Sequence, residues 1–179
     1  NDGRLHRFAE WYGSTGVPDE GLRLTDEQVA EGIRDREAKL GLAGRTFYRI
    51  GSQDCFSKKP DYKGGGQGES TAEVFAKYGL VMQPADVDRA QKIRRFRERL
   101  RVKTDSDGNM IERPMLVTYR TCKDFIRTIP AIPVDENNIE DVDGDSEDHP
   151  YDDSCQICMM RDLKASGARR KDKLHEAGV

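Results

Sequence analysis

Apolar residues recur at helical spacing after Thr25, where the first predicted helix begins. Val29 and Ile33 lie four residues apart and therefore share one face of a helix. Thr25 can cap the N-terminus of this helix, and Gln28, three residues later, completes a capping box. Glycine tolerates the left-handed backbone at a helix end, so Gly41 provides a stop. The pattern therefore predicts a helix that ends before Gly41.

Four further helices follow from similar signals. The clearest runs over residues 86–100, where Ala90, Ile93 and Phe96 form a narrow apolar stripe. The others are a helix from Ser70 to Lys77, one from about Thr121 to Ile129, and a last helix from about Asp148 to Leu163.

Short β-rich runs separate these helices. Residues 47–50 predict a central strand, residues 115–119 a second core strand, and residues 80–82 a third short strand. The sequence Asp105-Ser-Asp-Gly-Asn109 predicts a tight turn between two polar strands. Residues 4–12 are interpreted as one arm of a hairpin whose partner lies upstream of Asn1. Strands alternate with helices, so the predicted fold class is α/β.

Charge is segregated along the chain although the net charge is only -3. Residues 89–103 are strongly basic, residues 135–153 strongly acidic, and residues 161–173 basic again. Such segregation indicates a cation site and a polyanion-binding surface in one molecule. The alternative is that each run is a solvated face.

The four cysteines do not predict a disulfide framework. They are too few and too unevenly placed for a small secreted domain, so we expect reduced thiols. Cys155 and Cys158 form a CxxC inside a predicted helix without a second pair, which favours buried core residues over zinc ligands. The sequence has no signal peptide and no apolar run of membrane-spanning length. It begins at Asn1 without a methionine, so we interpret it as a fragment.

Asp54 is the first candidate metal ligand. It directly follows the apolar run 47–50, and open α/β sheets place functional groups at such strand ends. The alternative is that Asp54 only stabilises a turn.

The acidic run before the last helix supplies further oxygen ligands of the kind that hard divalent cations prefer. Asp148 and Asp152 lie four residues apart and share a helix face. Helix capping alone explains Asp148, but it explains Asp152, one turn deeper, less well. Residues 141–145 resemble a calcium loop only weakly, because they lack the EF-hand spacing.

The basic helix is the third candidate. A strip of arginines offers contacts to nucleic-acid phosphates, and without a recognition motif we expect binding to the backbone independent of sequence. The alternative is a solubilising face. The candidate DNA-binding residues are Arg89, Lys92, Arg94, Arg95, Arg97, Arg99, Arg101 and Lys103.

Several short motifs occur in a fixed order along the chain. They are Gly-Ser-Gln-Asp54, Gly-Glu-Ser-Thr-Ala-Glu-Val-Phe-Ala-Lys-Tyr-Gly-Leu80, Asp88-Arg89, Pro-Met-Leu-Val-Thr-Tyr119, Thr121-Cys122, Ile129-Pro130, Asp135-Glu-Asn137, Glu-Asp-Val-Asp143 and Glu-Asp-His-Pro-Tyr-Asp152. This order resembles the C-terminal nuclease domain of the large terminase subunit of tailed bacteriophages. The last two motifs are its most specific part, and the resemblance covers nearly the whole chain.

The resemblance implies a ribonuclease H-like fold, a mixed sheet flanked by helices, over residues 1–166, followed by a polar tail at 167–179. It implies an acidic triad that holds two Mg²⁺ or Mn²⁺ ions for phosphodiester cleavage. Asp54 matches the second member and Asp152 the third, with Asp148 or Asp153 as an outer ligand. The first member would lie on a strand upstream of residues 4–12, and the ATPase domain further upstream.

The implied function is cleavage of concatemeric double-stranded phage DNA during genome packaging. The portal protein and the small terminase subunit would be partners, in the cytoplasm of the infected bacterial host and without a membrane. The alternative is a non-catalytic nucleic-acid- or partner-binding module in which the acidic loop plays no chemical part.

Overall fold

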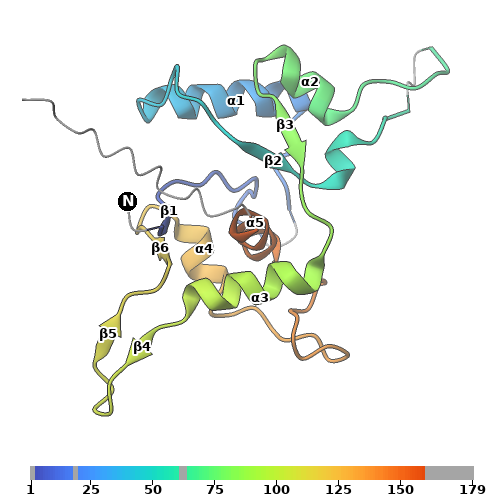
Figure 1. Cartoon of the computed structure of the whole chain (residues 1–179). Helices are drawn as coiled ribbons and strands as arrows, with labels where there is room; N and C mark the ends of the chain where they lie inside the picture. The colour runs from blue at the N-terminus through green and yellow to red at the C-terminus, as the bar shows by residue number, and fades with distance from the viewer. Residues whose placement is uncertain (1–2, 18–19, 61–63, 160–179) are drawn as a thin grey trace, which may run out of the picture.

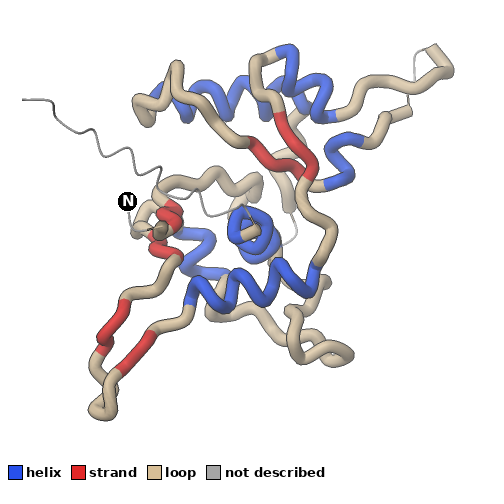
Figure 2. Tube along the Cα trace, viewed as in Figure 1, coloured by secondary structure: helices blue, strands red, loops and turns tan. Residues whose placement is uncertain are grey.

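The computed structural model describes residues 3–17, 20–60 and 64–159. These residues form a mixed α/β structure, which confirms the predicted class (Figures 1 and 2). The α-helices are α1 (Asp26–Lys39), α2 (Thr71–Lys77), α3 (Arg89–Leu100), α4 (Lys123–Thr128) and α5 (His149–Cys158), with a short 3-10 helix η1 (Gln53–Phe56). The strands are β1 (Leu5–Arg7), β2 (Arg49–Gly51), β3 (Met82–Pro84), β4 (Lys103–Thr104), β5 (Met110–Glu112) and β6 (Leu116–Thr118).

Capping boxes begin two of the helices. At α1, the Thr25 hydroxyl accepts the Gln28 N–H at 3.3 Å, and the Gln28 side chain accepts the Thr25 N–H at 2.9 Å. At α2, Ser70 and Glu73 make the same reciprocal pair. Each box satisfies backbone donors that an uncapped helix leaves without partners, so both predicted starts are confirmed.

The strands form three two-stranded sheets in the described part of the chain. β1 pairs in parallel with β6, β2 in parallel with β3, and β4 antiparallel with β5. A single mixed sheet was expected, but pairs of two or three residues end before a third strand joins them. The partner of β1 is β6, more than 100 residues away, rather than a neighbouring hairpin arm. The finer ribonuclease H-like arrangement remains a prediction.

The hydrophobic core consists of two clusters. The smaller joins α1 and α2 through Ala30, Phe75 and Leu80, in the part of Figure 1 where β2 and β3 also lie. The larger joins α3, β6, α4 and α5. Its members are Ile93, Phe96, Leu116, Cys122, Phe125, Val142, Tyr151, Cys155 and Cys158. Cys155 and Cys158 are therefore core residues, as predicted, and burial raises the pKa of their thiols to about 12 and about 11.

Some element ends differ from the predictions. Helix α3 begins after Asp88, whose side chain accepts the Gln91 N–H at 2.9 Å; Asp86 instead accepts the Asp88 N–H at 2.8 Å. Strand β3 lies two residues later than expected. The expected end of the last helix at Leu163 and the tail at 167–179 lie outside the described residues. No helix in the described part is long and apolar enough to cross a membrane.

Candidate metal and nucleic-acid site

Asp148 and Asp152 come together at the beginning of α5. Asp148 is the residue that precedes the helix, and its carbonyl accepts the Asp152 N–H at 2.9 Å. The two side chains therefore lie one turn apart on the same face, as the sequence predicted. The Asp148 side chain is 13% exposed and that of Asp152 40% exposed.

The carboxylate of Asp148 lies in an environment that disfavours its negative charge. Burial raises its pKa above the ordinary value for aspartate, and the charge of Asp152 raises it further. Arg89 and His149 act in the opposite direction but do not reverse the shift. An additional cation nearby would stabilise the charged form of such a carboxylate.

Arg89 is the cation that the structure places there. Its guanidinium forms a two-point ion pair with Asp141, with 3.0 Å between Nη2 and Oδ1, and its Nη1 donates to Asp152 at 3.2 Å. Arg89 thus faces three carboxylates, because the charge of Asp148 also acts on it. The charge of Arg97 also acts on Asp141, so two arginines oppose three carboxylates and a local negative potential remains.

Asp141 is the buried member of this group, with its side chain 8% exposed. Burial raises its pKa, but hydrogen bonds from Arg89 and from the Val142 N–H, with the charges of Arg89 and Arg97, outweigh burial and lower it. Arg89 is therefore the main group that stabilises the charged form of Asp141. The sequence analysis did not assign this role, because the partners lie 52 residues apart.

Asp54 lies elsewhere. It is an exposed residue of η1, which packs against α2 and β3, whereas α5 packs against α3 and α4. Strand ends meet at one edge only when the strands share a sheet, and the β2–β3 pair is separate from β1–β6. In this structure Asp54 therefore does not join Asp148 and Asp152.

The fit of these residues to a metal is consequently partial. Among the residues that the structure describes, no group of three or more histidine, cysteine, aspartate or glutamate side chains is arranged to hold a metal ion. Asp148 and Asp152 offer two ligands, whereas Mg²⁺ requires six in octahedral geometry, of which water supplies several. Residues 141–145 form turns, with the Asp143 carboxylate accepting the Asp145 N–H at 3.0 Å. The described residues therefore offer two neighbouring carboxylates at the start of α5 and not a complete metal site.

The predicted basic residues divide between different environments. Arg94, Arg97 and Arg101 line a groove of about 600 Å³ between α3 and residues 138–140. Arg95 pairs with Glu98 on the same helix, and Lys103 pairs with Glu112 across the β4–β5 hairpin. Lys92 and Arg99 are half-buried. The eight residues therefore do not form one continuous surface.

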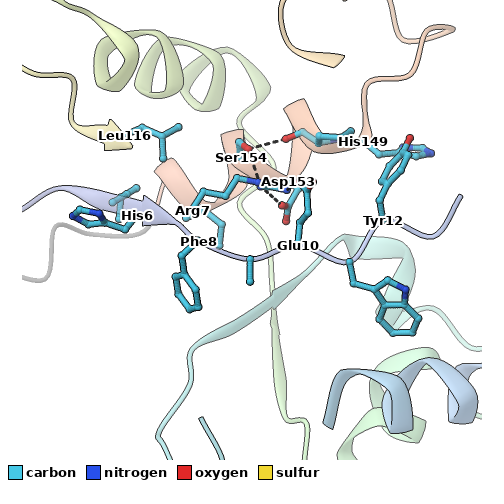
Figure 3. A pocket seen from close by; sticks show the side chains of 14 residues that line it. His6, Arg7, Phe8, Glu10, Tyr12, Leu116, His149, Asp153 and Ser154 are labelled. Atoms are coloured by element: carbon cyan, nitrogen blue, oxygen red, sulfur yellow. Dashed lines mark hydrogen bonds and ion pairs between the residues drawn. The ribbon is translucent and has the colours of Figure 1, made fainter. Parts of the chain in front are cut away.

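A second pocket, of about 560 Å³, lies between residues 5–12 and α5 (Figure 3). Arg7 reaches from β1 to α5, where it donates to Asp153 at 2.7 Å and to Ser154 at 3.1 Å. Glu10 accepts the backbone N–H groups of Asp124 and Phe125 at 2.6 and 3.3 Å. These contacts join β1 and the residues that follow it to α4 and α5, and Asp153 is the ion-pair partner of Arg7.

The sequence analysis did not identify Arg7 or Glu10. Their partners on α4 and α5 lie more than 100 residues away, and no local pattern marks those contacts. Comparison of the chain with family models, curated proteins and solved structures finds no match.

Proposed function

We propose that this chain is part of a metal-dependent DNA endonuclease domain of the large-terminase type. Two lines of reasoning support the proposal. The first is the order of motifs that ends in Glu-Asp-His-Pro-Tyr-Asp152. The second, which carries most weight, is the convergence of Asp148 and Asp152 around Arg89 with a raised pKa for Asp148. A carboxylate whose pKa is raised by burial and by a neighbouring negative charge is typical of functional sites.

The proposed roles follow from these positions. Asp152 is a direct metal ligand and Asp148 an outer one, with Mg²⁺ or Mn²⁺ as the cofactor. A two-ion site also requires Asp54 to approach α5, and the resemblance adds a carboxylate from a strand before Asn1. Double-stranded DNA is the proposed substrate. The packaging partners and the host cytoplasm are proposed on the resemblance alone.

Removing either carboxylate at α5 is expected to weaken Mn²⁺ binding at least about tenfold, because each supplies or orients an oxygen ligand. The variants are Asp148→Ala and Asp152→Ala, and the free Mn²⁺ signal in electron paramagnetic resonance measures the affinity. Asp54→Ala is expected to cause a further loss if η1 approaches α5 when the ion binds.

Asp145→Ala provides the matched control, because Asp145 is an exposed carboxylate of the same acidic segment. Its Mn²⁺ affinity should equal that of the unchanged protein. Cleavage of double-stranded DNA in the presence of Mn²⁺ is the second readout. The proposal fails if Asp152→Ala binds Mn²⁺ as tightly as Asp145→Ala.

Replacing Arg89 by glutamine is expected to strengthen Mn²⁺ binding several-fold. The guanidinium now neutralises the carboxylate of Asp152 at 3.2 Å, and a metal ion must compete with it. The same titration measures this effect at a temperature where the variant is folded. Weaker binding in Arg89→Gln would mean that Arg89 organises the ligands instead of competing for them.

One observation favours the second candidate, a binding module without catalysis. Acidic residues of this segment are already paired with arginines: Glu140 with Arg97, and Glu147 with Arg127 through two bonds of 2.6 and 2.7 Å. Carboxylates that are already paired with arginines offer less uncompensated negative charge to a metal ion. DNA binding in EDTA without any Mn²⁺ binding would support this function.

A further inference from the structure

The groove beside α3 carries three arginines in a regular array. Arg94 and Arg97 lie on one face of α3, Arg101 directly follows the helix, and all three line the groove at intervals of three and four residues. At 1.5 Å per residue they span about 10 Å. This length corresponds to about three nucleotides of one DNA strand, which carries a phosphate every 3.4 Å along the axis.

The positive charge of the groove is only partly compensated. Within the described residues, Arg94 and Arg101 form no ion pair, and both are exposed. Two carboxylates line the same groove, those of Glu98 and Glu140. Glu98 is paired with Arg95, which does not line the groove, so Glu140 is the carboxylate that pairs with a groove arginine.

Glu140 supplies the carboxylate that pairs with Arg97 in this groove. Its carboxylate accepts a hydrogen bond from Arg97, yet its side chain is 75% exposed, so little besides this ion pair holds it. Exposed ion pairs contribute little stability and exchange readily. Arginine pairs with phosphate in the same two-point geometry as with a carboxylate.

We propose that this groove binds the phosphate backbone of DNA through Arg94, Arg97 and Arg101, and that Glu140 occupies the Arg97 position until DNA displaces it. The proposal rests on the proposed function in taking DNA as the ligand. It narrows the eight basic residues of the sequence prediction to three, and it adds an internal competitor. An acidic protein is the other ligand class with suitable charge, but it lacks the regular spacing of a phosphate backbone.

The test is the affinity for a short fluorescent DNA duplex, measured by anisotropy over a range of salt concentrations. EDTA is present, so metal binding and cleavage do not contribute. Arg94→Gln, Arg97→Gln and Arg101→Gln should each weaken binding up to about eightfold at 0.1 M salt and reduce the salt slope by about 0.9, the value for one lost phosphate contact. Glu140→Gln should strengthen binding several-fold, because Arg97 is released and a negative charge is removed.

Two controls carry the same charge change. Arg45→Gln removes an exposed arginine between α1 and β2, outside the groove. Arg120→Gln removes an exposed arginine that does not line the groove. Both control variants should show the same salt slope of DNA binding as the unchanged protein. All five exchanged basic residues lie outside the two hydrophobic clusters, and circular dichroism confirms that each variant is folded.

The proposal is overturned if the three groove variants bind DNA like Arg120→Gln, or if Glu140→Gln fails to strengthen binding. It is also overturned if the groove variants lose affinity for poly-glutamate but keep their affinity for DNA, because the ligand of the groove is then an acidic protein. If the groove variants show the reduced salt slope but the unchanged protein binds no Mn²⁺, the groove proposal is supported and the endonuclease proposal is rejected. If the protein cleaves DNA with Mn²⁺ and the groove variants cleave it equally well, the endonuclease proposal is supported and the groove proposal is rejected.

Discussion

Replacing Phe96 by alanine is expected to lower the free energy of unfolding by about 3–5 kcal/mol, the range for a large aromatic residue in a core. Phe96 is 2% exposed and lies at the centre of the larger cluster. Its ring meets Tyr151 edge-on at 5.3 Å between centroids and Phe125 at 6.5 Å. The loss is a large share of the 5–15 kcal/mol that stabilises a typical domain. Urea denaturation monitored by circular dichroism measures it.

Phe8→Ala is the matched control, because Phe8 is 47% exposed and lies outside both clusters. It should cost less than about 1 kcal/mol. If Phe96→Ala does not fold, Phe96→Leu keeps the test possible, since it preserves more of the volume and should cost about 1–2 kcal/mol. Equal losses in Phe8→Ala and Phe96→Ala would contradict the assignment of this core.

Replacing Arg89 by glutamine is expected to destabilise the protein by about 2 kcal/mol at neutral pH. The Asp141 carboxylate, 8% exposed, loses its main partner and remains charged in a poorly hydrated position. The estimate lies below that for a fully buried pair, because the Arg89 side chain is 45% exposed and water compensates in part. Urea denaturation of both proteins gives the difference.

The pH dependence of this difference separates the ion pair from simple packing. The pKa of Asp141 is lowered in the folded protein, so its stabilising effect is present above the ordinary unfolded value of about 3.9 and is lost as the pH falls through the folded value. In Arg89→Gln that lowering is relieved. The two proteins should therefore differ fully near pH 7 and converge below about pH 4. A difference that stays constant with pH would assign the effect to packing of the arginine stem, and Arg120→Gln should show no difference at either pH.

Part of the candidate site could be read from the sequence. The spacing of Asp148 and Asp152 already places them on one helix face, because four residues make about one turn. The sequence could not reveal that Arg89 lies against them, since the ion pair joins residues 63 positions apart. The position of Asp54 also depended on strand pairing, and no local pattern decides which strands pair.

The DNA-binding residues were likewise predicted only in part from the sequence. The composition of residues 89–103 identifies a basic helix, but all its arginines look equivalent there. Only the packing of residues 138–140 beside α3 separates Arg94, Arg97 and Arg101 from the other basic residues, and only that packing brings Glu140 to Arg97.

The sequence by itself determined the elements whose stabilising contacts are local. The capping boxes at Thr25 and Ser70 and the Asp105–Asn109 turn, where Gly108 has φ +82, depend on residues three or four positions apart. The tertiary structure decided the pairing of β1 with β6, the division into three small sheets, and the partners of the charged residues. Those contacts join distant segments, and their energies arise only when burial brings the segments together and lowers the local dielectric constant.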